Sequence, residues 1–143
     1  MKNKHFQQLI NMYQAAPINA FYCPTMTISE GTAEIQIPLK PEFHHSAGAV
    51  HGSVYFKLLD DAAFFAANSL EPEFFVLTTS FTTYLTRPVS DGAMKAVGRV
   101  VNQNKSQFIV ESIVYDEQER EIGRGNGIFV RGKFRLNDAL GYA

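Results

Sequence analysis

Apolar residues near the N-terminus recur with a helical period. They occupy positions i, i+3, i+4 and i+7 of one helix face and are Phe6, Leu9, Ile10 and Tyr13. Pro17 follows this stretch and cannot continue a helix, because proline lacks the backbone N–H. The pattern predicts a helix over residues 2–15, within an N-terminal helical segment of residues 1–16.

A second helical pattern, more apolar than the first, extends from about residue 53 to residue 69. One broad sector of this helix is formed by Val54, Leu58, Leu59, Ala62, Phe65 and Ala66. Apolar side chains also occupy much of the remaining circumference, which indicates a helix enclosed by other elements rather than one on the surface. Glu71-Pro72-Glu73 ends the pattern.

Alternating apolar and polar positions predict strands on both sides of this helix. Residues 25–28 and 33–37 flank Ser29-Glu30-Gly31 and predict a hairpin. Four further runs rich in Thr, Val, Phe and Ile follow the helix, over residues 74–87, 94–104, 108–115 and 121–131. This order predicts an α+β fold with a mostly antiparallel sheet wrapped around one long central helix. Short connections favour a meander of the last four strands, followed by a C-terminal tail over residues 132–143.

Composition narrows the possible partners. The chain has 143 residues, a length that predicts one domain over residues 1–143. Charged residues make up 19% and the net charge is −1, so no nucleic-acid partner is expected. The single cysteine, Cys23, excludes an intramolecular disulfide and a Cys-rich zinc site. The longest apolar run, residues 62–67, is far shorter than the ~20 residues of a membrane helix. The first residues do not have the pattern of a secretory signal, so we expect a cytoplasmic protein with no membrane association.

Two adjacent carboxylates, Asp60 and Asp61, lie in the middle of the enclosed helix. At ~100° per residue they face different sectors, and Lys57 at i−4 predicts an ion pair with Asp61. Asp60 has no such local partner and lies among aromatic and small residues. Loss of solvation there should raise its pKa toward that of a general base. The structural alternative is that Asp60 faces a wet groove or accepts a hydrogen bond from a loop N–H.

The segment before the helix carries three histidines and two glycines, in the run His44-His45-Ser46-Ala47-Gly48-Ala49-Val50-His51-Gly52-Ser53. A metal site is disfavoured because no acidic residue lies within it at ligand spacing, so we expect neither a metal nor a cofactor. Gly52 at the helix start instead leaves a free N–H, which can stabilise a developing negative charge. Ser53 as a plain helix cap and a structural role for His51 remain open.

The run from His51 to Asp60, His-Gly-Ser-Val-Tyr-Phe-Lys-Leu-Leu-Asp, resembles the His-Gly-Gly…Asp signature of hot-dog-fold acyl-CoA thioesterases. The similarity is to the phenylacetate-degradation (PaaI-like) type, and residues 66–69 and 84–88 also resemble that group. It covers roughly residues 18–131 and implies a hot-dog fold with an extra N-terminal helix. It also implies hydrolysis of an acyl-CoA by a homodimer or a dimer of dimers, with active sites at the subunit interface.

The resemblance also implies roles for individual residues. Asp60 would be the general base or nucleophile, and the Gly52 N–H would polarise the thioester carbonyl. His45 replaces an assisting Asn of the family, and Thr78 matches a Ser that orients water in some members. Ser53 replaces the second Gly of the signature, which narrows the approach to the backbone.

Substrate contacts follow less directly. Phe56 and Phe64 could line the acyl site, and Arg87 and Lys105 could contact the phosphates of CoA, although for each cation the role of a solvated strand-end charge is favoured over ligand contact. The expected substrate-binding residues are His51, Ser53, Phe56, Phe64, Arg87 and Lys105.

Two other functions are compatible with the same residues. His45 with Asp60 could serve a hot-dog enoyl-thioester hydratase or dehydratase, although the His-Phe-Pro-Gly context of such enzymes is missing. The chain could also be a non-catalytic acyl-CoA-binding module, because one fold hosts several functions.

Overall fold

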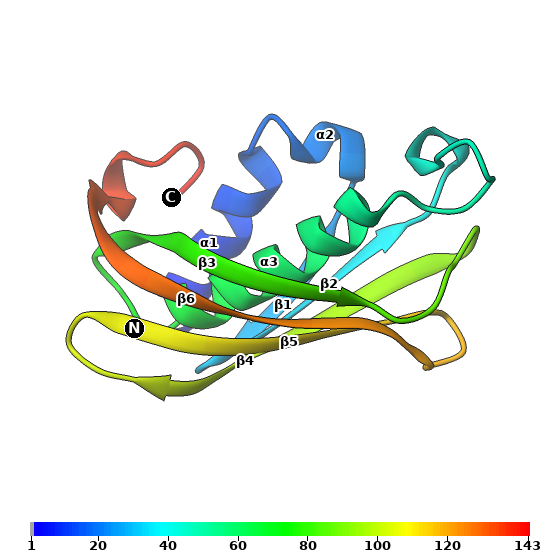
Figure 1. The fold of residues 1–143 in the computed structure, drawn as a ribbon. Coiled ribbons are helices and arrows are strands. Elements are labelled where there is room, and N and C mark those ends of the chain that lie inside the picture. Colours follow the sequence, from blue (N-terminus) through cyan, green and yellow to red (C-terminus); the bar gives the residue numbers. More distant parts are fainter. Residues whose placement is uncertain (1) are drawn as a thin grey trace.

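The structure, a computed structural model, describes residues 2–143 and consists of one curved sheet around a long helix (Figure 1). The helix is α3 (Gly52–Asn68). The six strands are β1 (Thr25–Ser29), β2 (Thr32–Pro38), β3 (Phe74–Leu85), β4 (Ala93–Gln103), β5 (Gln107–Tyr115) and β6 (Glu121–Arg135). All neighbouring strands are antiparallel, in the order β1-β2-β4-β5-β6-β3. The predicted α+β fold, a sheet wrapped around a central helix, is confirmed.

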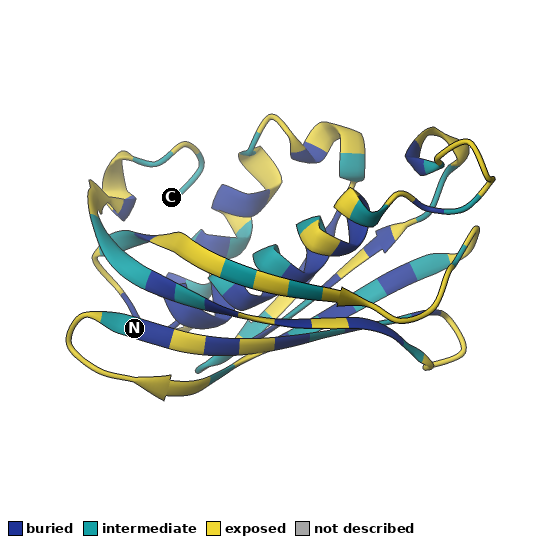
Figure 2. Ribbon diagram, in the orientation of Figure 1, coloured by how far each residue is buried: buried dark blue, intermediate teal, exposed yellow. Residues whose placement is uncertain are grey.

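Helix α3 lies against the concave face of the sheet, and ten of its residues are buried, whereas Ser53 and Phe56 near its start are exposed (Figure 2). Leu58, Leu59 and Ala62 are fully buried. Its many alanines allow a close approach to β4, where a Cβ at Gly98 would collide with the backbone of Ala62. A sequence that is apolar around much of its circumference therefore marks the element that the sheet surrounds.

The N-terminal segment covers the other side of α3. Helix α1 (Lys2–Ala15) and the short α2 (Asn19–Tyr22) lie above α3 in Figure 1, with the sheet below. Tyr13 packs edge-to-face on Phe65 of α3, with the ring centroids 4.8 Å apart. No helix among residues 2–143 is long and apolar enough to cross a membrane.

The C-terminal residues return to α1. Strand β6 extends to Arg135, so the first part of the predicted tail belongs to the sheet. The short helix η2 (Leu136–Asp138) follows, and the Tyr142 hydroxyl lies 2.6 Å from Nδ1 of His5. The tail thus packs on α1 instead of extending away from the fold.

The predicted meander is correct for β4, β5 and β6 but wrong for β3. Strand β3 pairs with β6, and β4 pairs with β2 on its other side. The connection over residues 86–92 must cross three strand spacings, roughly 14 Å, whereas seven extended residues reach roughly 25 Å. Strands β3 and β4 are therefore joined by a short connection without being neighbours in the sheet. As a result β3 is an edge strand with one free edge, and most of its residues are exposed (Figure 2).

Candidate active site

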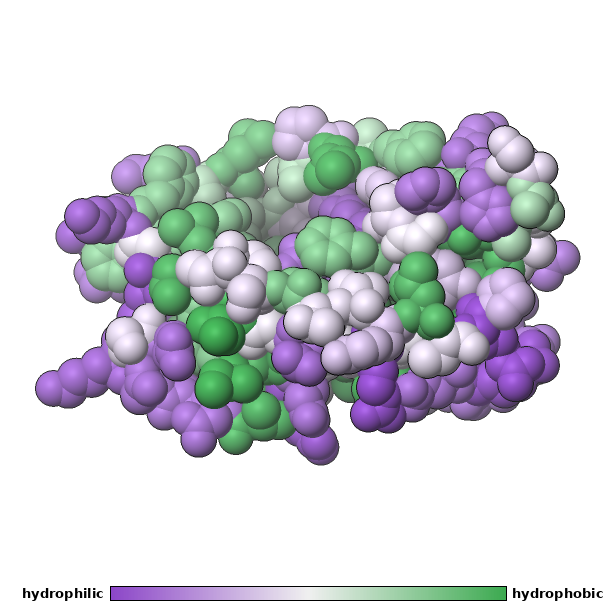
Figure 3. Space-filling view, viewed as in Figure 1, coloured by the Kyte–Doolittle hydropathy of each residue, from purple (hydrophilic) through white to green (hydrophobic). Residues whose placement is uncertain are grey.

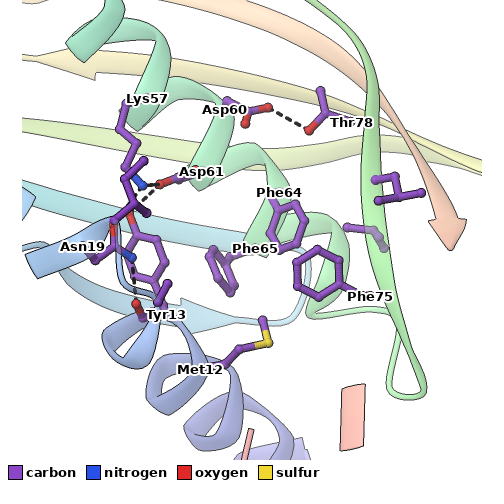
Figure 4. Close-up of a pocket in the computed structure, with 14 residues that line it drawn as sticks. Met12, Tyr13, Asn19, Lys57, Asp60, Asp61, Phe64, Phe65, Phe75 and Thr78 are labelled. Carbon is purple, nitrogen blue, oxygen red and sulfur yellow. Dashed lines mark hydrogen bonds and ion pairs between the residues drawn. The ribbon is translucent and has the colours of Figure 1, made fainter. Parts of the chain in front are cut away.

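Asp60 lies in the middle of α3 and faces β3 (Figure 4). The Thr78 hydroxyl donates a hydrogen bond to Oδ1 of Asp60 over 2.9 Å. A register shift between Thr78 and Ser80 marks a β-bulge at this point of the strand, a common device for aiming a side chain at a site. The residue pair implied by the family resemblance is therefore in contact, and the local partner that Asp60 lacks on its own helix comes from β3.

The surroundings of Asp60 adjust its acidity. Burial raises the pKa of Asp60 to about 6, opposed in part by the hydrogen bond from Thr78. The neighbouring Asp61 carboxylate raises this pKa further, and the Lys57 ammonium lowers it. This agrees in direction with the shift expected from the helical wheel. A carboxylate with a pKa near 6 is ionised at neutral pH and still basic enough to accept a proton from water.

Asp61 has a separate, structural set of partners. Its Oδ2 accepts hydrogen bonds from Lys57 Nζ over 2.6 Å and from the Tyr13 hydroxyl over 2.7 Å. Lys57 also donates to Oδ1 of Asn19, and the Asn19 amide donates to the carbonyl of Tyr13. The predicted Lys57–Asp61 ion pair is confirmed. The roles of Tyr13 and Asn19 were not predicted, although a tyrosine on the apolar face of a helix needs a partner for its hydroxyl.

The start of α3 presents a free backbone donor. Gly52 is the first helical residue, and no acceptor among residues 2–143 takes its N–H. His51 caps the helix, because its Nδ1 accepts the Ser53 N–H over 3.0 Å. The expected alternative of Ser53 as the cap is thus wrong: Ser53 donates to the cap, and its hydroxyl lies 2.8 Å from the same nitrogen. The His51 side chain therefore satisfies the N–H of Ser53 and leaves the N–H of Gly52 available.

His45 lies at the same end of the helix. Its Nδ1 accepts the backbone N–H of Ala47 over 3.0 Å. In a neutral imidazole the proton must then sit on Nε2, which becomes a donor as the amide of an Asn would be. His45, Gly52 and Arg87 line one hollow of about 380 Å³.

The three histidines of the segment do not form a metal site. His44 bonds through Nε2 to the carbonyl of Ser90 over 2.6 Å, His45 turns to Ala47, and His51 caps α3. Over the described chain, residues 2–143, no group of three or more His, Cys, Asp or Glu side chains is close enough to hold a metal ion.

The remaining predicted contacts are spread over the molecule. Phe64 lines the hollow beside Asp60, and Phe56 is 42% exposed and packs on Phe81 at 5.7 Å between ring centroids. Lys105 is exposed at the other end of α3, where its carbonyl accepts from Arg131, which pairs with Glu71. Within one chain, Lys105 and the Gly52 hollow therefore lie at opposite ends of α3.

Asp60 and Gly52 also occupy different hollows of the chain. Eight residues of α3 separate them, which at 1.5 Å per residue is about 12 Å. A base and an oxyanion donor act on one carbonyl within hydrogen-bond reach, directly or through one water. The two groups of a single chain are therefore too far apart to act on the same carbonyl.

Comparison with known proteins places this geometry in a family. The sequence model of the thioesterase superfamily matches residues 47–122, more than half of the chain. The chain belongs to the thioesterase superfamily. Two curated relatives of this hydrolase are candidate esterases, from Sulfurisphaera tokodaii (24% identity) and Thermoplasma volcanium (26%). Each aligns over 102 residues, 71% of this chain and 76% or 77% of the relative.

Solved structures show the same fold as this superfamily member. The PaaI protein from the E. coli phenylacetic acid degradation operon has a TM-score of 0.86 and 20% identity, over 94% of this chain and 97% of that one. A thioesterase family protein from Silicibacter pomeroyi has a TM-score of 0.82 and 21% identity, over 90% and 99%. The predicted hot-dog fold is confirmed.

The thioesterase match includes some parts of the site and leaves others out. Gly52, Asp60 and Thr78 fall within residues 47–122. The N-terminal segment, with Tyr13 and Asn19, lies outside the matched span, although it packs directly against the helix that carries Asp60.

Proposed function

We propose that the chain hydrolyses an acyl-CoA thioester at sites that two copies of the chain build together. The observation that carries this proposal is the Asp60 carboxylate on α3, hydrogen-bonded to Thr78 beside an apolar hollow. Membership of the thioesterase superfamily supports the reaction type. The similarity to acyl-CoA thioesterases and the cation Arg87 beside the Gly52 hollow support CoA as the thiol.

In the proposed mechanism Asp60 acts as general base. Its carboxylate takes a proton from a water molecule, the water oxygen attacks the thioester carbon, and the carbonyl becomes an oxyanion. The Gly52 N–H and the Nε2–H of His45 stabilise that oxyanion at the positive end of the α3 dipole. Collapse of the intermediate breaks the C–S bond, and the CoA thiolate recovers the proton from Asp60. Thr78 holds the carboxylate in place throughout.

The geometry of α3 favours a second copy as the source of the missing group. Gly52, Phe56 and Asp60 are spaced four residues apart and lie within about 80° of the helix circumference. If two α3 helices pack antiparallel about a two-fold axis at Phe56, then Gly52 of each copy lies opposite Asp60 of the other. Such an interface is self-complementary and makes two identical sites.

The surface beside this helix supports the same pairing. We define the pairing surface as Phe56, Leu77, Tyr84 and Leu85, all of which are 42–53% exposed. Figure 3 shows apolar and weakly polar side chains over β3 and the middle of the molecule, with strongly hydrophilic ones along the lower edge. The free edge of β3 adds unpaired backbone groups to this surface. An apolar surface next to an open strand edge suits a homodimer, whose further pairing would give a dimer of dimers.

The cations remain proposed contacts to CoA. Arg87 lines the hollow at the start of α3, where the thioester carbonyl would lie. Lys105 lies beyond the end of α3 in its own chain, so in an antiparallel pair it would approach the helix start of the other copy. Both are exposed and free to turn toward phosphate groups.

Release of free CoA thiol tests the proposal. Wild-type protein should release thiol from at least one member of an acyl-CoA series that spans short, medium, long and aryl groups. Asp60→Asn should lower kcat by at least about 100-fold, the range for loss of a general base. Asp91→Asn, an exposed carboxylate outside both hollows, serves as the matched control and should retain wild-type turnover. Near-wild-type turnover by Asp60→Asn would overturn the assignment.

A further inference from the structure

The N-terminal segment forms one wall of the hollow beside Asp60 (Figure 4). The hollow has a volume of about 350 Å³ and opens next to the Asp60–Thr78 pair. On the α3 and β3 side its apolar lining is Phe64, Phe65, Phe75, Val76 and Leu77, and on the other side Met12, Ala16 and Ile18. Five of the fourteen residues that line the hollow next to the proposed base therefore come from α1, α2 and their connection, outside the span matched by the superfamily.

The polar groups of this hollow are already paired with one another. The Tyr13 hydroxyl and Lys57 donate to Asp61, Lys57 also donates to Asn19, and the Asn19 amide donates to the Tyr13 carbonyl. Burial and Asp61 both raise the pKa of the Tyr13 hydroxyl, which therefore remains a donor. A substituent that needs a polar partner would have to break one of these bonds. The hollow consequently favours an apolar occupant.

The same bonds fix the wall. Two of them, Tyr13 to Asp61 and Lys57 to Asn19, connect α1 and α2 to α3 across 48 and 38 residues of sequence, in addition to the packing of Tyr13 on Phe65. A wall held in this way has a defined position relative to Asp60. It can therefore limit the size of what lies beside the carboxylate.

We propose that this segment selects the acyl group, and that Ala16 and Ile18 set its maximum length. The volume equals that of about a dozen water molecules at ~30 Å³ each, which suits an apolar acyl group of about six to ten carbon atoms, linear or aromatic. A charged acyl group is excluded by the apolar lining and by Asp60, and a long linear chain by the N-terminal wall. This inference rests on the proposed function, since it names the acyl class of the same site.

Filling the hollow tests the proposal directly. Ala16 is half-buried in the lining, whereas Ala20, four residues later on α2, is exposed and outside it. Thiol release should be measured with acetyl-, octanoyl-, benzoyl- and palmitoyl-CoA for wild type, Ala16→Phe and the matched control Ala20→Phe. Wild type should prefer octanoyl- and benzoyl-CoA. Ala16→Phe should lower kcat/KM for these two at least about tenfold through KM while acetyl-CoA changes less than about twofold, and Ala20→Phe should match wild type.

Enlarging the hollow should have the opposite effect and favour longer acyl groups. Ile18→Ala should raise the ratio of palmitoyl- to octanoyl-CoA turnover, because it removes part of the length limit. A uniform loss on all four substrates in Ala16→Phe would show that the N-terminal segment has only a structural role, and would overturn the inference while leaving thioester hydrolysis intact.

Binding separates this inference from the proposed function. The affinity of octanoyl-CoA thioether, which cannot be hydrolysed, should be measured by calorimetry for the same variants. Weaker binding by Ala16→Phe but not Ala20→Phe would support the acyl wall even if wild type released no thiol, an outcome that would by itself overturn hydrolysis. Equal binding by wild type, Ala16→Phe and Ala20→Phe would overturn the proposal that the N-terminal segment selects the acyl group.

Discussion

At the scale of single residues, the proposed chemistry depends on the ionisation of Asp60. Its pKa of about 6 means that the carboxylate is protonated, and so useless as a base, below that pH. The hydrogen bond from Thr78 stabilises the ionised form and lowers this pKa. Removing that donor therefore makes the carboxylate protonate at a higher pH than in the wild type.

We therefore expect kcat/KM to fall as the pH falls through about 6, and Thr78→Val to move this acidic limb to higher pH. A pH–rate profile from pH 4.5 to 8.5 measures the acidic limb of the wild type and of Thr78→Val. Thr79→Val is the matched control, because the Thr79 hydroxyl donates to the Ile128 carbonyl and not to Asp60. An unchanged or lowered apparent pKa in Thr78→Val would contradict the role given to this bond.

At the scale of elements, α1 is attached to α3 by the hydrogen bond from the Tyr13 hydroxyl to Asp61 as well as by the packing of the Tyr13 ring on Phe65. Tyr13→Phe keeps the edge-to-face contact with Phe65 but removes one of the two donors to Oδ2 of the part-buried Asp61 carboxylate, which then keeps only Lys57. The free energy of unfolding should fall by about 1–3 kcal/mol, as measured by urea denaturation. Tyr115→Phe should change it by less than about 0.5 kcal/mol, because the Tyr115 hydroxyl has no hydrogen-bond partner among residues 2–143. Equal losses in the two variants would show that the bond contributes nothing specific.

Element types were largely predictable from the sequence, whereas their pairing was not. The apolar circumference of residues 53–69 identified α3 as the enclosed helix, because that pattern directly reports burial. The position of β3 beside β6 was not predicted, since strand alternation reports which face is buried and not which neighbour is bonded. The same limit applies to Tyr13 and Asn19, whose contacts with α3 join residues 38 or more positions apart.

The candidate site was predictable only where its geometry is local. The helical wheel isolated Asp60 from Asp61, and the helix start at Gly52 followed from the preceding glycine-rich segment. Thr78 came from the family resemblance alone, because a bulge in β3, which no periodicity indicates, brings it to Asp60. His51 was taken as a structural or substrate-binding residue, and the structure makes it the helix cap.

At the scale of the whole molecule, the distance of about 12 Å along α3 between Gly52 and Asp60 requires that each proposed site takes one group from each copy. Two inactive variants can test this requirement. Asp60→Asn removes the base. Gly52→Pro removes the N–H without breaking the helix, because proline is favoured at the first helical position and His51, with φ −63° and ψ 143°, already has the conformation that a following proline needs. The added ring requires only a shift of the exposed Leu85 side chain, whose Cδ1 would lie 2.8 Å from the new Cβ.

Each variant alone should lose activity at both sites of its homodimer, by about 100-fold or more for the oxyanion donor. After the two are unfolded together and refolded as an equal mixture, half of the dimers should contain one copy of each. In such a dimer one site combines the intact Gly52 of one copy with the intact Asp60 of the other, so thiol release should recover to about a quarter of wild type. A mixture of Asp60→Asn with the double variant Gly52→Pro/Asp60→Asn is the control and should recover nothing. Absence of recovery in the first mixture, with mixed dimers shown by mass spectrometry, would mean that Gly52 and Asp60 act within one copy and would overturn the shared site.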